Sequence, residues 1–86
     1  MPPITIYTRP GCGYCAAAKA LLNKKGAAFE EINIWEKPGA REEMTSRSGG
    51  GNTVPQIFIG ERHVGGSDDL YALERNGELD SLLGIV

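Results

Sequence analysis

The chain has only two cysteines, Cys12 and Cys15, and they lie where a strand pattern gives way to a helix pattern. Residues 4–7 before them alternate in the way typical of a strand, and residues 14–25 after them are rich in alanine and leucine, which favour a helix. A spacing of three residues on a helical turn places the two Cα atoms about 5 Å apart, within the range that a disulfide requires. The disulfide between them can therefore form and break without movement of the backbone.

The two cysteine positions predict different roles. Cys12 is expected at the mouth of the helix, where free backbone N–H groups and the helix dipole favour an anion, and Arg9 adds a positive charge three residues earlier. We expect the pKa of Cys12 to fall from about 8.5 into the range of roughly 3.5 to 7.5 that such sites show. Cys15 is expected one turn deeper, where neighbouring side chains cover it. Cys12 is therefore the predicted nucleophile and Cys15 the predicted resolving thiol.

Two other uses of the cysteine pair are alternatives. Half of a structural zinc site would need two more ligands, whereas the rest of the chain offers one histidine, His63, and no further cysteine. A purely structural disulfide would close so short a loop that it would remove little entropy from the unfolded chain. The redox-active pair is the favoured interpretation.

Length and composition predict one small globular domain over residues 1–86. Hydrophobic residues make up 41% of the chain and charged residues 23%, as in ordinary proteins with one core. The net charge of -2 argues against general nucleic-acid binding. The sequence shows neither a targeting pattern nor an apolar run of membrane length, so we expect a cytoplasmic protein without membrane attachment. Reducing conditions there favour a catalytic cysteine pair over a structural one.

Eight elements are predicted in the order β-α-β-α-β-β-α-α. Strands are expected at residues 4–7, 28–34, 56–59 and 62–64, and helices at residues 14–25, 40–48, 67–75 and 78–83. The first two strands should be parallel because a helix connects them, whereas the tight turn at Gly60-Glu61 makes the last two a hairpin. Ser67 is expected to cap the third helix, and His63 to point outward from an edge strand. The predicted fold class is α/β, with a four-stranded mixed sheet flanked by helices.

Three motifs in combination resemble those of the glutaredoxins, a family with the thioredoxin-like fold. The motifs are Cys12-Gly13-Tyr14-Cys15, Thr53-Val54-Pro55 and Gly65-Gly66-Ser67-Asp68. The resemblance covers essentially the whole chain and is closest to the short bacterial-type dithiol glutaredoxins. It implies a glutathione-dependent thiol–disulfide oxidoreductase that reduces glutathione mixed disulfides and protein disulfides.

The same resemblance implies a glutathione site. In glutaredoxins the proline of Thr-Val-Pro is cis and faces the active site, which would bring Pro55 beside Cys12 and let the Val54 backbone pair with the cysteinyl part of glutathione. The other implied binding residues are Arg9 at the glycine carboxylate, Tyr14 and Thr53 along the groove, and Gly66, Ser67 and Asp68 at the γ-glutamyl end. Physical chemistry agrees, because an anionic tripeptide needs N–H donors and a cation, with an acid for its amino group.

Partners and one further alternative also follow from the resemblance. Glutathione would be the co-substrate, and glutathionylated or disulfide-containing proteins would be the substrates of a monomer that glutathione reductase and NADPH serve indirectly. Some glutaredoxins with Gly or Ser after the first cysteine, as at Gly13 here, hold a [2Fe–2S] cluster between two chains and two glutathiones. Cluster carriage through Cys12 is therefore the alternative function. A thioredoxin-like reductase fits less well, because thioredoxins have tryptophan before the first cysteine, where this chain has Gly11.

Overall fold

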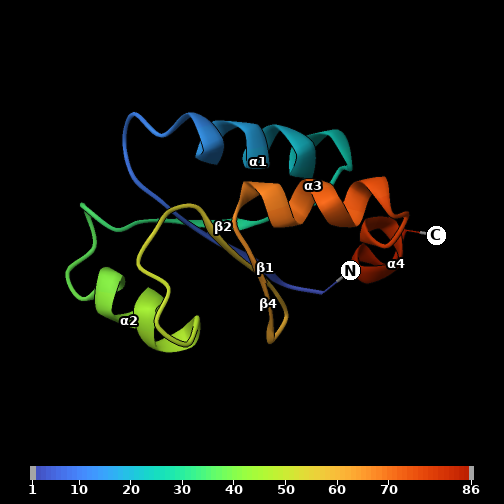
Figure 1. Ribbon diagram of the computed structural model, residues 1–86. Helices are drawn as coiled ribbons and strands as arrows, with labels where there is room; N and C mark the ends of the chain where they lie inside the picture. Colours follow the sequence, from blue (N-terminus) through green and yellow to red (C-terminus); the bar gives the residue numbers. More distant parts are fainter. Residues whose placement is uncertain (1, 86) are drawn as a thin grey trace.

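The computed structural model describes residues 2–85 and contains a four-stranded mixed sheet with helices on both faces (Figure 1). The strands are β1 (Ile4–Thr8), β2 (Glu30–Asn33), β3 (Gln56–Ile59) and β4 (Arg62–Gly65). The helices are α1 (Gly13–Lys24), α2 (Ala40–Arg47), α3 (Ser67–Arg75) and α4 (Leu79–Leu83). The element order and the α/β fold class are those predicted from the sequence.

The strands lie in the order β2-β1-β3-β4. β1 pairs in parallel with β2, because α1 returns the chain to the same end of the sheet. The β1–β3 and β3–β4 pairs are antiparallel, so the expected hairpin is confirmed. The parallel arrangement brings the carboxyl ends of β1 and β2 to the same end of the sheet. The turn that carries the cysteines follows β1 at this end.

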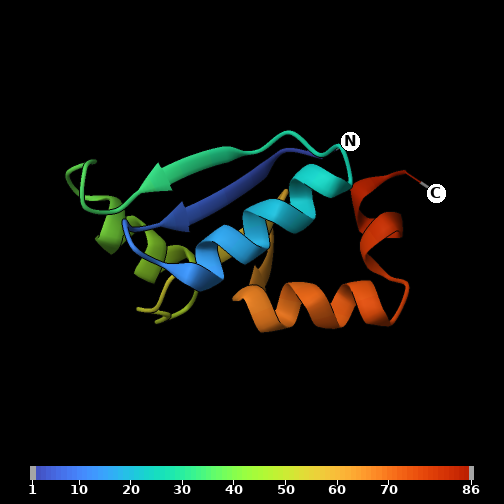
Figure 2. The same cartoon turned by 90° about the horizontal axis from the view of Figure 1, so that it is seen from above.

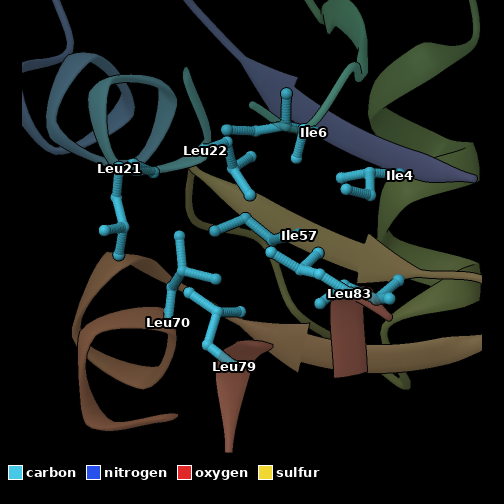
Figure 3. Packing of buried hydrophobic residues seen from close by; sticks show 11 residues of the cluster. Ile4, Ile6, Leu21, Leu22, Ile57, Leu70, Leu79 and Leu83 are labelled. Atoms are coloured by element: carbon cyan, nitrogen blue, oxygen red, sulfur yellow. The ribbon is translucent and has the colours of Figure 1, made fainter. Parts of the chain in front are cut away.

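The larger hydrophobic cluster lies between the sheet and the helices α1, α3 and α4 (Figure 3). Its labelled members come from strands and helices alike: Ile4, Ile6, Leu21, Leu22, Ile57, Leu70, Leu79 and Leu83. Figure 2 shows α1 and α3 together on this face, and the hydroxyl of Tyr71 donates to the carbonyl oxygen of Ala17 at 3.1 Å. The start of α1 and the start of α3 are thereby held over the same sheet.

A smaller cluster fills the opposite face beneath α2, and its buried members are Tyr7, Ile32, Ile34, Ala40, Met44 and Phe58. The Arg47 guanidinium lies 4.2 Å from the centre of the Phe58 ring and donates to the Tyr7 hydroxyl at 3.1 Å. Burial, followed by the 2.7 Å hydrogen bond from this hydroxyl to Glu43, raises the pKa of Tyr7. Apolar residues therefore cover both faces of β3, which the apolar run at residues 56–59 predicted.

Several predicted boundaries were wrong by one or two residues, and the starts of β2 and α4 are two examples. β2 begins at Glu30 rather than at residue 28, because Ala27 packs into the core and its N–H donates to the carbonyl of Leu22 at 3.0 Å, which closes the end of α1. α4 begins at Leu79, with Glu78 as its N-cap. Within residues 2–85 we find no helix with the length and apolar character needed to cross a bilayer.

Candidate active site

The two cysteines lie on the turn between β1 and α1. Cys12 is the N-cap of α1 and has extended backbone angles (φ -96°, ψ 107°), and Gly11 before it has a φ of 73°. Glycine adopts this left-handed conformation readily, so the chain can turn sharply from strand into helix. The Cα atoms of Cys12 and Cys15 are 5.2 Å apart and their sulfurs form a disulfide. The predicted placement of a disulfide-forming pair at the mouth of a helix is confirmed.

The two sulfurs have different surroundings. The side chain of Cys15 is only 2% exposed, whereas Cys12 is half-buried. The backbone N–H of Cys15 donates to Sγ of Cys12 at 3.1 Å. After reduction, the same N–H and the positive end of α1 would stabilise a negative charge on Cys12. The expected burial of Cys15 is confirmed, and the geometry gives Cys12 the access that a nucleophile needs.

A groove of about 320 Å³ lies beside the cysteine turn. Three segments that are distant in sequence form it: the start of α1, the loop before β3, and the end of β4 with the first turn of α3. Seven of the predicted glutathione-binding residues line it, namely Tyr14, Thr53, Val54, Pro55, Gly66, Ser67 and Asp68. The tertiary structure therefore brings together residues that lie up to 54 positions apart in the sequence.

Val54 connects this groove to the cysteines. Its carbonyl oxygen lies 3.9 Å from Sγ of Cys12. The peptide bond between Val54 and Pro55 is cis, as the family resemblance implied, and Pro55 is buried. Val54, which lines the groove, therefore lies next to the sulfur of Cys12, although Cys12 itself lines a second hollow.

Arg9 lies outside the groove. With both cysteines it lines a second hollow, of about 550 Å³, that shares no residue with the first. Its side chain is exposed, and Nη1 donates to the carbonyl oxygen of Pro10 at 3.4 Å. The cysteine turn thus separates Arg9 from the other predicted binding residues.

Glu31 in this second hollow is held by two donors. The Thr8 hydroxyl donates to Oε2 of Glu31 at 2.8 Å, and Nζ of Lys19 lies 3.0 Å from the same oxygen. These two interactions, with the Thr8 hydrogen bond the stronger cause, lower the pKa of Glu31. The network ties the end of β1 to β2 and α1 directly beneath the cysteine turn.

The first turn of α3 forms the far end of the groove. The N-cap is Gly66, one residue earlier than predicted, and Ser67 is already helical with its side chain only 6% exposed. Oδ2 of Asp69 accepts a hydrogen bond from the N–H of Gly66 at 3.0 Å. The side chain that caps α3 therefore belongs to the helix itself. Asp68 is exposed beside it, next to backbone N–H groups that suit a carboxylate.

Sequence reasoning missed two polar residues of the groove, Gln56 and His63. Gln56 is 6% exposed, and its Oε1 lies 2.6 Å from Nε2 of His63. The ring of His63 is exposed, as expected for an edge strand, and it stacks on Phe58 with 5.0 Å between ring centres. A polar residue at the start of an otherwise apolar strand was the available signal, because buried amides are normally hydrogen-bonded.

No three side chains of His, Cys, Asp or Glu converge as a candidate metal site in the part of the chain that the structure describes. His63, the histidine that a zinc half-site would have to recruit, pairs with Gln56 instead.

The chain is similar to known proteins over nearly its whole length. The Glutaredoxin family model matches residues 4–64. A glutaredoxin from Pseudomonas aeruginosa is 58% identical over 83 residues, which cover 96% of this chain and 98% of that protein.

Two solved structures extend the comparison. Glutaredoxin from Brucella melitensis is 64% identical with a TM-score of 0.83, covering 99% of this chain and 91% of that one. The buckwheat glutaredoxin–glutathione complex is 29% identical with a TM-score of 0.87, covering 96% of this chain and 77% of that one. Together with the disulfide-forming pair at the helix mouth, these likenesses support thiol–disulfide oxidoreductase activity, and the chain belongs to the glutaredoxin family.

Proposed function

We propose that the protein uses glutathione to reduce glutathione mixed disulfides and protein disulfides. One observation carries the proposal: the half-buried sulfur of Cys12 lies 3.9 Å from the carbonyl oxygen of Val54, and Val54 lines a groove that reaches the N-terminus of α3. A mixed disulfide with its glutathione half in this groove would present its sulfur to Cys12. The buckwheat relative, whose structure is a glutathione complex, supports the choice of ligand.

With a glutathionylated substrate, the Cys12 thiolate attacks the glutathione sulfur. A Cys12–glutathione disulfide forms, and the substrate sulfur leaves as a thiolate that takes a proton from water. A second glutathione, as its thiolate, then attacks the glutathione sulfur on Cys12. Oxidised glutathione leaves, and the Cys12 thiolate is restored.

With a protein disulfide, Cys12 attacks one sulfur and the other leaves as a thiolate. Cys15, once deprotonated, attacks Sγ of Cys12, which releases the reduced protein and forms the Cys12–Cys15 disulfide. The Cα separation of 5.2 Å suits this closure, because disulfides span about 4.4–6.8 Å between Cα atoms. A glutathione thiolate then attacks Sγ of Cys12 and displaces Cys15 as a thiolate. A second glutathione attacks the glutathione sulfur on Cys12, which releases oxidised glutathione and restores both thiols.

We assign the ends of glutathione to two parts of the site. The Val54 backbone pairs with the cysteinyl part, and Thr53, Pro55 and Tyr14 flank it. Gly66, Ser67 and Asp68 take the γ-glutamyl end, where the N–H groups of α3 suit its carboxylate and Asp68 suits its amino group. Arg9 lies exposed on the other side of the cysteine turn, and we assign the glycine carboxylate to it.

The cellular setting follows from this chemistry. We propose that residues 1–86 act as one monomeric domain in the cytoplasm. Glutathione reductase and NADPH would regenerate the glutathione that the protein consumes. Neither nucleic acid nor a membrane is among the proposed partners.

Turnover of a glutathionylated small disulfide, coupled to NADPH through glutathione reductase, tests the proposal. We expect Cys12→Ser to abolish turnover, and Cys15→Ser to retain it while losing reduction of a protein disulfide. Equal loss in both variants would contradict the assignment of roles. A wild-type protein that reduces protein disulfides with dithiothreitol but does not turn over the glutathionylated substrate would contradict the dependence on glutathione.

The access to Cys12, which is half-buried, compared with the buried Cys15 favours one second candidate, carriage of a [2Fe–2S] cluster. Within residues 2–85 no three side chains of His, Cys, Asp or Glu come together. We therefore assign the ligands of the cluster to Cys12 from two copies of the chain and to two glutathiones. Anaerobic purification with glutathione should then give a coloured dimer that dissociates when the cluster is lost. A colourless monomer that is active in the turnover assay would exclude this second role.

A further inference from the structure

The groove wall beside Cys12 has few hydrogen bonds of its own. Across residues 2–85, no backbone–backbone hydrogen bond involves residues 52–54. Apart from the Cys12 sulfur near the Val54 oxygen, one hydrogen bond holds this segment: Nε2 of Gln56 donates to Oγ1 of Thr53 at 3.3 Å. The backbone of Val54 is thus left available to pair with an extended ligand. The side chain of Val54 packs against the smaller hydrophobic cluster, and the Gln56 amide supplies the hydrogen bond to the segment.

Gln56 is itself held in one orientation. Its amide is nearly buried, at 6% exposure, and its Oε1 lies 2.6 Å from Nε2 of His63. An amide oxygen can only accept, so the imidazole must donate from Nε2, and the amide NH₂ then faces Thr53. The stacking of the His63 ring on Phe58, at 5.0 Å between centres, fixes the ring from behind.

We propose that Gln56 is a positioning residue for glutathione and that His63 sets its orientation. The chain of contacts runs from the His63 imidazole on β4, through the Gln56 amide on β3, to the Thr53 hydroxyl and so to the Val54 backbone. A wall segment that is ordered before binding loses less conformational freedom when the ligand pairs with it. The inference rests on the proposed function, because it deepens the account of the same groove.

Gln56→Met tests the inference, because methionine keeps the length of the side chain and removes both hydrogen-bonding ends. We expect the KM for the glutathionylated substrate to rise about three- to tenfold, the usual effect of losing one or two hydrogen bonds. The kcat at saturating substrate should stay within about twofold, since Gln56 touches neither sulfur. The rate of Cys12 alkylation by iodoacetamide should not change. Arg62→Gln, on the same hairpin but outside the groove, is the matched control and should leave both constants unchanged.

Two variants at the exposed His63 keep the test independent of the folding of Gln56→Met. His63→Leu removes the N–H that donates to the Gln56 amide oxygen, so it should raise the KM. His63→Gln places a side-chain N–H near the former Nε2, so its KM should return toward the wild-type value. A folded Gln56→Met protein with wild-type KM would overturn the inference, and so would equal KM values for the two His63 variants. An inactive wild-type protein would instead point to failure of the proposed function itself.

Discussion

Gly65 ends β4 immediately before the cap of α3, and its φ of 114° is one that other residues rarely adopt. A Cβ at this position would collide with the carboxylate of Asp69, which accepts the N–H of Gly66. Gly65→Ala should therefore strain the backbone and break the cap together, at a cost of about 2–3 kcal/mol in the free energy of unfolding. It should also raise the KM for the glutathionylated substrate, because the first turn of α3 forms one end of the groove.

Gly77→Ala is the matched control for this prediction. Gly77 also has a positive φ, of 75°, but a Cβ there would meet no atom within 4 Å. Only the backbone term remains, so we expect a loss of about 1 kcal/mol and an unchanged KM. Urea unfolding and steady-state kinetics measure both quantities, and equal losses at Gly65 and Gly77 would show that contact with Asp69 has no effect.

At the scale of elements, Glu31 joins β2 to β1 and α1 through Thr8 and Lys19. Because these contacts lower the pKa of Glu31 in the folded protein, they add stability above the ordinary glutamate pKa of about 4.3. That stability is lost as the pH falls through the lower folded pKa. Glu31→Gln should therefore reduce the free energy of unfolding at pH 7, by up to about 1 kcal/mol for a pair this exposed.

Urea unfolding of Glu31→Gln across pH checks the sign of this effect. The gap between wild type and variant should narrow below about pH 4, as the wild-type carboxyl takes up its proton. Glu30→Gln is the control, since Glu30 precedes Glu31 on β2 and has no ion pair among the described residues. A gap that is constant with pH would mean that Glu31 contributes through packing rather than charge.

At the scale of the whole molecule, α4 closes the larger hydrophobic cluster. Leu79 and Leu83 are fully buried, whereas Leu82 is only partly buried (Figure 3 shows the first two). Lys25, at the end of α1, lies 2.8 Å from carboxylate oxygens of both Glu74 and Asp80, so it ties α1 to α3 and α4. The last helix thus helps to hold α1 and α3 in place, and the N-termini of these two helices form parts of the active site.

Leu79→Ala should cost about 2–5 kcal/mol in the free energy of unfolding, because it leaves a cavity in the core. That is a large share of the roughly 5–15 kcal/mol that stabilises a typical domain. Leu82→Ala, on the same helix, should cost clearly less. Thermal or urea unfolding measures both, and similar losses would indicate that α4 is not docked as described.

Much of the architecture could be predicted from sequence because local patterns determine it. The alternation of residues 4–7, the alanine-rich helix and the apolar run at residues 56–59 each specify an element through their own spacing. A spacing of three residues at the start of a helix is likewise enough to predict that Cys12 and Cys15 can form a disulfide. The family motifs then indicated seven residues that line the groove, and their roles toward glutathione stay predictions.

Tertiary contacts decided the rest. Gln56 becomes a groove residue only because β4 brings His63 against it, and Arg9 lies apart from the groove only because the cysteine turn comes between them. The cap of α3 lies at Gly66 rather than Ser67 because packing buries the Ser67 side chain and Asp69 supplies the acceptor. These features depend on residues that are distant in sequence and adjacent in space, and local propensity does not encode which of them will meet.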